Sequence, residues 1–390
     1  MIPKSDTATG LPPLDAASRA HEQAMLDHIH TLVQQSPQGF ISLETWIDHA
    51  LYAPGLGYYA AGNTKFGSAL PTGDFTTAPE LTPLFGKTLA RQTAQVLEQS
   101  NSMHVLEFGA GSGALAHALV PALAELGLQV RYQILEVSAD LQARQKQRLA
   151  PLGDQIQWLD ALPENFVGCV IANEVLDAMP PTVFAFDDHG ELNEVGVRMA
   201  TAASPDTRRF ELATRTAGRE LRNCVLERMP AYPGYQSEIN LRAEAWIKEM
   251  GRWLERGAAL LIDYGFPQRE YYHPQRAEGT LMCHFRHYAH ADVLRHPGLQ
   301  DITTHVDFTA MADAALEAGL DVLGYTSQAR FLMNAGLPDL LTQATPHDLS
   351  AVQKLLSEAE MGELFKVLAV GRGIDPPLIG FARGDRRDTL

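Results

Sequence analysis

The sequence predicts an α/β fold with a mostly parallel central sheet. The first observation is that short apolar runs alternate with segments of helical periodicity; these runs are 105–108, 130–135, 156–158, 167–172 and 258–262. The second is a glycine-rich turn after the first run, and the third is that polar side chains follow the other runs. Such a pattern is typical of parallel strands with helices on both faces and a ligand site at the carboxyl ends of the strands.

Composition limits the classes of protein that fit. The 390 residues are 45% hydrophobic and 20% charged, which indicates a globular chain with a large core. A formal net charge of −16 argues against a nucleic-acid partner. Three cysteines without paired spacing indicate reduced thiols. No apolar run reaches the roughly 18 residues of a membrane span, and residues 1–15 resemble neither a secretory nor a mitochondrial leader. We therefore expect a cytoplasmic protein without membrane insertion.

The first hundred residues predict an arm followed by helices. Residues 1–18 are Pro-rich and polar at their start, and we expect a flexible arm there. Apolar spacing then predicts helices over 18–35, 43–52 and 81–98, of which the second begins after Ser42. We assign 19–100 to an N-terminal helical and lid segment, and 101–390 to the ligand-binding domain.

The loop at 72–80 is rich in hydroxyls and acids. Asp74 and Thr77 fit turn and N-cap positions without any further role. A loop placed just before a ligand-binding strand is also suited to cover the site. We therefore retain Asp74 and Glu80 as candidate acids, and Phe75 and Thr77 as candidate substrate contacts.

A glycine-rich turn at 109–113 joins the first strand to a helix predicted over 114–126. Glycines allow positive φ and close approach of a ligand, and the helix offers unpaired N–H groups. The spacing also fits a dinucleotide-binding turn, and a ligand-free structural turn is a third interpretation. Glu107, two residues before Gly109, and the missing side chain at Gly113 favour S-adenosylmethionine (SAM). The candidate cofactor contacts here are Glu107, Gly109, Ala110, Gly111 and Gly113.

The second and third strands each end in an acid. Glu136 follows the second strand 27 residues after Gly109, where a carboxylate can accept both hydroxyls of a ribose. Asp160 follows the third strand and can accept from an adenine amino group, although an ordinary loop acid fits equally. Val137 and Ala161 adjoin these acids and complete the predicted nucleoside contacts.

The fourth strand ends in Asn173, followed by Glu174 and Asp177. Because ligands of open parallel sheets sit beyond the carboxyl ends of the strands, these side chains are placed for chemistry. The two acids also fit the start of a helix, where its dipole stabilises negative charge. We assign Asn173 and Glu174 to cofactor binding, and Glu174 and Asp177 to catalysis.

The remainder of the chain predicts insertions at about 181–250 and 266–308. Alternation with a period of two predicts antiparallel strands between 181 and 216, whereas 266–305 reads as long and irregular. Cys283, His284, His287 and His290 match no zinc-ligand spacing, so we expect no metal. The other predicted elements are helices over 239–254 and 309–318 and strands over 320–325 and near 365–370.

Four motifs together resemble the MidA family of class I SAM-dependent methyltransferases. They are 107–113, 73–80, 173–180 and 301–308, and the resemblance extends from about 29 to 371. It implies a Rossmann-like, mostly parallel seven-stranded sheet, SAM as cofactor, and methylation of arginine in a protein. The eukaryotic members are mitochondrial and linked to complex I assembly, so the acceptor implied for them is a respiratory complex I subunit. The acceptor of members resembling this chain is left open by the resemblance.

Methyl transfer to a guanidinium requires carboxylates that orient it and help a proton leave, because its pKa exceeds about 12. We rank Glu174 and Asp177 first, Glu80 and Asp74 second, and Asp307 third. Candidates that shape the acceptor pocket are Tyr264, Arg286 and His305. Two other functions stay open: a small-molecule N- or O-methyltransferase, and a non-catalytic assembly factor that binds SAM.

Overall fold

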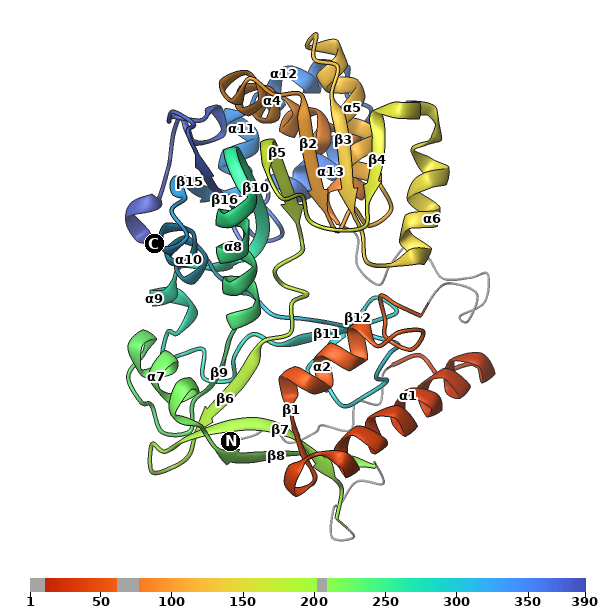
Figure 1. Ribbon diagram of the computed structural model, residues 1–390, viewed down its shortest axis with the longest axis vertical. Helices are drawn as coiled ribbons and strands as arrows, with labels where there is room; N and C mark the ends of the chain where they lie inside the picture. Colours follow the sequence, from red (N-terminus) through yellow and green to blue (C-terminus); the bar gives the residue numbers. More distant parts are fainter. Residues whose placement is uncertain (1–10, 62–76, 202–208) are drawn as a thin grey trace. The chain divides into compact units, whose positions relative to one another are not determined.

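The computed structural model describes residues 11–61, 77–201 and 209–390, which form two compact units (Figure 1). The described part of the first unit comprises 11–61, 178–201, 209–242 and 269–305. The second comprises 77–177, 243–268 and 306–390. Each unit is thus assembled from separate stretches of the chain.

The second unit is built on an eight-stranded sheet. Seven of its strands follow the order β15-β16-β10-β5-β2-β3-β4, and the short β14 pairs with β10 as an eighth where seven were expected. The strands are β2 (His104–Phe108), β3 (Arg131–Leu135), β4 (Ile156–Leu159), β5 (Phe166–Asn173), β10 (Leu254–Phe266), β14 (Val306–Asp307), β15 (Asp321–Ser327) and β16 (Phe365–Arg372).

Most neighbours in this sheet run parallel. The pairs β4–β3, β3–β2, β2–β5 and β5–β10 are parallel, and only β16 runs antiparallel to its two neighbours among the pairings of this sheet that the structure describes. The chain builds outward from β2 through β3 to β4, and then returns to β5 on the other side of β2. The predicted mixed α/β class with a mainly parallel sheet is therefore confirmed, and the order reverses at β2, where a ligand is expected.

Helices cover both faces of this sheet. They are α3 (Ala78–Leu81), α4 (Pro83–Ser100), α5 (Ala114–Glu125), α6 (Ala139–Arg148), α8 (Leu241–Trp253), α10 (Phe308–Glu317), α11 (Gln328–Asn334), α12 (Leu337–Leu340) and α13 (Pro346–Leu356). Short 3₁₀ turns occupy Ala150–Gln155, Leu341–Gln343, Ile379–Phe381 and Arg387–Thr389.

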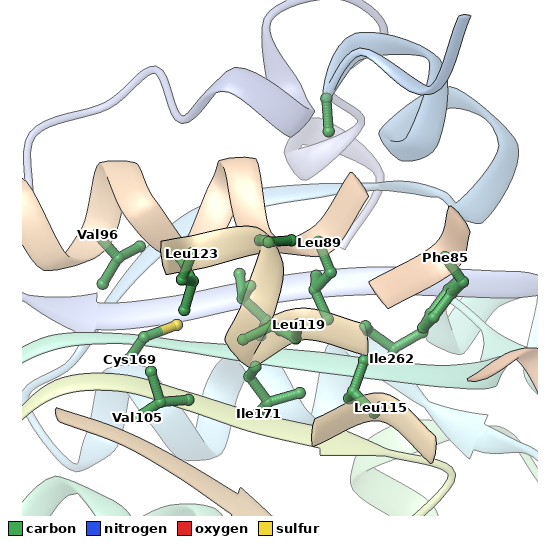
Figure 2. Packing of buried hydrophobic residues seen from close by; sticks show 14 of the residues in the cluster. Phe85, Leu89, Val96, Val105, Leu115, Leu119, Leu123, Cys169, Ile171 and Ile262 are labelled. Atoms are coloured by element: carbon green, nitrogen blue, oxygen red, sulfur yellow. The ribbon is translucent and has the colours of Figure 1, made fainter. Parts of the chain in front are cut away.

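The main core of this unit lies between α4, α5 and one face of the sheet (Figure 2). Leu89 of α4 and Leu119 of α5 are fully buried against strand residues such as Ile171. On the opposite face, the ring of Phe108 lies 4.9 Å from that of Trp246 in α8, edge to face. Val105 and Phe108 therefore point to opposite faces of the sheet, as side chains three positions apart on a strand do. Packing on both faces fixes the end of β2, where the glycine turn begins.

The first unit contains two antiparallel sheets. One follows the order β1-β7-β6-β9 with β8 paired to β7, and the other follows β12-β11-β13. Its elements are α1 (Ala16–Gln35), the turn Pro37–Gly39, β1 (Phe40–Ser42), α2 (Leu43–Tyr52), β6 (Thr182–Phe186), β7 (Leu192–Met199), β8 (Phe210–Thr216), α7 (Arg219–Arg228), β9 (Gln236–Ile239), α9 (Gln268–Tyr271), β11 (Met282–Phe285), β12 (Tyr288–His290) and β13 (Asp301–Thr303).

The segment expected to be irregular, 266–305, contains the three-stranded sheet instead. The reason is a buried acid distant in sequence: Glu238 on β9 accepts the backbone N–H of Thr280 at 3.0 Å and that of Leu281 at 3.3 Å. Local periodicity does not reveal such an anchor.

Among the residues that the structure describes, no helix combines the length and apolar character needed to cross a bilayer.

Candidate functional site

The glycine turn adopts the backbone that was predicted for it. Gly109, Gly111 and Gly113 have φ of 59°, 52° and 81°, which L side chains rarely adopt. A Cβ at Gly109 would lie 3.2 Å from Val175 Cγ2, whereas one at Gly111 would meet no atom within 4 Å. The turn is therefore open at Gly111 and closely packed at Gly109.

Glu136 lies beside this turn, because Gly109 donates its N–H to the carbonyl of Leu135 at 3.2 Å. Its Oε1 accepts the N–H of Ser138 at 2.9 Å, and its Oε2 accepts from Gln145 Nε2 at 2.9 Å. Burial raises the pKa of Glu136, and these donors oppose that shift. The carboxylate is thus held at a fixed orientation next to the glycines.

Val137, Asp160 and Ala161 lie along the same edge of the sheet. Leu135 and Leu159 are register partners in parallel strands, so the residues that follow them emerge side by side. All three predicted nucleoside contacts are exposed, and Val137 is 78% exposed. An exposed apolar side chain beside an acid suits the face of an adenine ring.

Glu107, a predicted cofactor contact, is more deeply buried than we expected. Its side chain is 3% exposed, and its Oε2 accepts the hydroxyl of the fully buried Tyr132 at 2.8 Å. Burial, together with the charge of Glu136, raises the pKa of Glu107 to about 8. The structure places this acid in the packing between β2 and β3, and its contact with a cofactor stays a prediction.

The turn after β5 brings several acids together. Asn173 and Ile262 are register partners, and Glu174 donates its N–H to the carbonyl of Ile262 at 2.9 Å. Glu174 has φ of 54°, an uncommon conformation for a residue with a side chain. Strained backbone of this kind clusters at functional sites, and Asn173 Nδ2 donates to Glu174 Oε1 at 3.0 Å.

Asp263, at the end of β10, fixes this turn and was not among the predicted site residues. Its Oδ2 accepts the N–H groups of Leu176 and Asp177 at 3.0 and 3.2 Å, and its Oδ1 accepts that of Tyr264 at 2.9 Å. Burial, with the neighbouring charges of Asp177 and Glu174, raises its pKa well above the usual range. The only signal in the sequence was its place after an apolar strand.

Glu80 and Asp307, ranked second and third among the candidate acids, have partners within the second unit. Glu80 on α3 forms an ion pair with Arg148 of α6 at 2.9 Å and accepts a hydrogen bond from Ser112 in the glycine turn. Asp307 caps α10, because its Oδ1 accepts the N–H groups of Thr309 and Ala310. Both contacts are those of structural acids at helix ends or in ion pairs.

The predicted substrate contacts are dispersed. Thr77 lies just before α3 without a capping bond from its side chain, and the ring of Tyr264 lies 5.3 Å from that of Phe365. In the first unit, Arg286 donates to Asp15 Oδ2 at 3.2 Å, and His305 donates its N–H to Thr280 Oγ1. The structure thus gives Arg286 a partner at the start of α1. Asp74 and Phe75 lie outside the described residues.

The hydrogen-bond acceptors at this site fit SAM. Asn173 Oδ1 is buried without a hydrogen-bond partner in the part of the chain that the structure describes, which leaves an acceptor for an amino group. Glu136 provides acceptors for ribose hydroxyls, and the open backbone at Gly111 leaves room for a ligand. Within the same described residues, no group of three or more His, Cys, Asp or Glu side chains is arranged to hold a metal ion.

Comparison with known proteins decides the family. Residues 88–326 match the model of a family described as "Putative S-adenosyl-L-methionine-dependent methyltransferase". The chain belongs to this family. The MidA resemblance and the predicted SAM cofactor are both confirmed, and this MidA-family chain is a SAM-dependent methyltransferase. SAM as the cofactor argues against the dinucleotide interpretation of the glycine turn, and the contact of SAM with this turn stays a prediction.

Several relatives match nearly the whole MidA-family chain. "Protein arginine methyltransferase NDUFAF7, mitochondrial" of Rattus norvegicus is 27% identical over 411 residues, covering 93% of this chain and 90% of the relative. Its Drosophila melanogaster homologue is 25% identical, covering 88% and 86%. A crystal structure of a COG1565 superfamily member from Burkholderia thailandensis, bound to S-adenosyl-homocysteine, is 46% identical with a TM-score of 0.90, covering 98% of this chain and all of that one.

Proposed function

We propose that this methyltransferase transfers a methyl group from SAM to a guanidinium nitrogen of arginine in a protein acceptor. The observation that carries the proposal is the convergence of Glu174, Asp177 and Asp263 at the neighbouring ends of β5 and β10. Relatives named protein arginine methyltransferase, at 25–27% identity, support the same acceptor class. A cationic acceptor also suits a chain with a formal charge of −16.

The proposed roles at the cofactor follow the order of the strands. Glu136 accepts hydrogen bonds from the ribose hydroxyls, and Asn173 Oδ1 accepts one from an amino group of SAM. Gly109, Ala110, Gly111 and Gly113 let the ligand approach the backbone, and Val137, Asp160 and Ala161 adjoin the base. When bound, SAM would supply a methyl group whose carbon a nucleophile can attack, with the positively charged sulfur as the leaving group.

The proposed reaction requires that the protein orient the guanidinium of the acceptor and supply a group that accepts its proton. A guanidinium is protonated at neutral pH. When its nitrogen forms the new N–C bond and the bond from the methyl carbon to sulfur breaks, that nitrogen must release one of its own protons to a base. Glu174 is the first candidate to hold the guanidinium and take this proton, because it is only partly buried and leads the strained turn. Asp177, 6% exposed, is the second, and it adds negative charge behind Glu174.

The proposal ranks the remaining acids lower. Glu80 pairs with Arg148 on α6 and Asp307 caps α10, so each has a structural role at a helix, whereas Glu174 lies in the strained turn at the carboxyl end of β5. Asp74 lies outside the described residues. Phe75, Thr77, Tyr264, Arg286 and His305 remain proposed contacts of the acceptor. A complex I subunit, the acceptor implied for the eukaryotic members, is the first candidate to test.

The test is mass spectrometry of a lysate incubated with the protein and isotope-labelled SAM. The proposal predicts labelled methylarginine in protein with the wild type and with Glu164→Gln, an exposed control, and a loss of about 100-fold or more with Glu174→Gln. Complex I subunits are searched for the mark first. Label found only in small molecules favours a metabolite methyltransferase. Absence of transfer despite SAM binding favours a non-catalytic binder, and either result contradicts the proposal.

A further inference from the structure

Gln145 is a buried amide at the centre of the proposed nucleoside site. It lies on α6, and none of its side chain is exposed. Its Nε2 donates to the carbonyl of Gly111 at 2.9 Å and to Glu136 Oε2 at 2.9 Å. Its Oε1 accepts from Trp158 Nε1 at 3.0 Å. One side chain therefore connects the glycine turn, the acid after β3, and β4.

The chemistry of the partners fixes the orientation of this amide. An indole N–H can only donate, and a backbone carbonyl can only accept. The atom facing Trp158 must therefore be the amide oxygen, and the NH₂ group must face Gly111 and Glu136. A rotation of the amide by 180° would put an N–H against the indole N–H, which leaves two buried donors without acceptors.

This orientation determines what Glu136 can offer a ligand. A carboxylate has roughly four acceptor positions, two on each oxygen. Ser138 uses one position on Oε1, and Gln145 uses one on Oε2. The backbone N–H of Val137 interacts with this carboxylate as well. Three of the roughly four positions are therefore engaged, and at least one is left for the hydroxyls of a ribose.

We propose that Gln145 is a positioning residue for ribose recognition, which holds Glu136 so that the remaining acceptor capacity of its carboxylate faces the ribose hydroxyls. This inference rests on the proposed contact between Glu136 and the ribose. Gln145 reaches the cofactor only through Glu136 and the Gly111 carbonyl, so its contribution depends on the hydroxyls of the ligand. A residue that merely stabilises α6 would affect ligands with and without hydroxyls equally.

The pKa of Glu136 also supports a positioning role for Gln145. Burial raises the pKa of Glu136, and the hydrogen bond from Gln145 lowers it. Removal of that donor therefore favours the protonated carboxyl, which has lost one acceptor. The loss of orientation and the loss of charge thus weaken the same contact.

The experiment compares S-adenosyl-homocysteine with its 2′,3′-dideoxy analogue by isothermal titration calorimetry. The wild type is expected to bind the hydroxylated ligand at least about tenfold more tightly, as hydrogen bonds to a charged acceptor require. In Gln145→Leu this ratio is expected to fall below about threefold. Gln147→Leu makes the same change at an exposed position of α6 and should retain the wild-type ratio.

The outcomes distinguish the role of Gln145 from the contact between Glu136 and the ribose. If Gln145→Leu weakens both ligands equally and keeps the wild-type ratio, the role of Gln145 is overturned while the contact of Glu136 stands. If the wild type does not distinguish the ligands, the contact of Glu136 fails, and the inference fails with it. Should Gln145→Leu melt at a temperature too low to measure, Trp158→Phe decides, because it frees the amide to rotate and is expected to reduce the same ratio.

Discussion

The backbone N–H of Asp177 donates a hydrogen bond to Oδ2 of Asp263, with 3.2 Å between the two atoms. The same oxygen accepts from Leu176, so one carboxylate at the end of β10 holds the turn that follows β5. This turn begins with Glu174 in its left-handed conformation. The strained residue proposed to hold the acceptor is therefore supported by a buried acid that lies 86 positions away from Asp177 in the sequence.

Substitution of Asp263 by Asn should separate catalysis from cofactor binding. The amide keeps the size of the side chain, but its NH₂ group would face a backbone N–H that the carboxylate now satisfies. We expect methyl transfer to fall about 100-fold, as misplacement of a reacting group does, while the Kd for S-adenosyl-homocysteine changes less than about threefold. Transfer of labelled methyl groups and calorimetry measure the two quantities. Asp321→Asn, exposed on β15, is the control, and a loss of binding with intact transfer would contradict the assignment.

Glu107 should make the stability of the protein depend on pH. Its pKa rises from about 4.5 in the unfolded chain to about 8 in the fully buried site, so the folded state holds a proton that the unfolded state releases. Stability must therefore decrease as the pH rises from about 4.5 to about 8, by at most about 5 kcal/mol.

The variant Glu107→Gln removes this titration and can still accept the hydroxyl of Tyr132. Its melting temperature should be close to that of the wild type at pH 5 and higher than that of the wild type at pH 9. Glu125→Gln, exposed at the end of α5, should show no such crossover. Parallel melting curves of the wild type and Glu107→Gln across this range would show that the buried acid is ionised in the folded state.

Two glycines offer a matched test of the glycine turn. Gly111 and Gly127 both have positive φ, and a Cβ at either would meet no atom within 4 Å. Alanine at each position should therefore cost a similar 1–2 kcal/mol or so of stability. Only Gly111→Ala should weaken binding of S-adenosyl-homocysteine, by about tenfold or more, because its methyl group enters the space assigned to the ligand. Equal affinity in both variants, measured by calorimetry, is the contrary result.

Glu80 and Glu174 should affect different kinetic constants. Glu80 joins Arg148 and Ser112, so Glu80→Gln loosens the glycine turn and should raise the KM for SAM several-fold with little change in kcat. Glu174→Gln should instead lower kcat and leave the KM for SAM within about threefold. Steady-state kinetics with labelled SAM distinguish the two, and a large fall in kcat for Glu80→Gln would restore it as a catalytic candidate.

Much of the second unit could be predicted because its signals are local. The glycines, the apolar strands and the acids that follow them are contiguous in sequence. The same holds for one helix of the first unit, because the helix predicted over 43–52 is α2. Ser42 caps that helix through the N–H of Thr45, as its position predicted. Periodicity and capping depend on near neighbours, so one sequence carries them.

The features that were missed depend on contacts between distant parts of the chain. Gln145 occurs in a polar helix and gives no sign that it is fully buried, because its partners Gly111 and Trp158 come from other elements. The sheet within 266–305 was missed for the same reason. The helix α13 was missed although it has a local signal, the capping box of Thr345 and Asp348. The hydrogen bond from Tyr132, on the next strand, to the carboxylate of Glu107 was likewise not foreseen, because it joins residues from different elements.

The central claim is that the cofactor lies over the glycine turn with its transferable methyl group toward 173–177. A crystal structure of this chain with S-adenosyl-homocysteine tests it most directly. We predict that Glu136 accepts both ribose hydroxyls, that the amino-acid end crosses 109–113, and that the sulfur faces Asn173 and Glu174. A ligand whose ribose makes no contact with Glu136, or whose sulfur faces away from 173–177, would contradict the account.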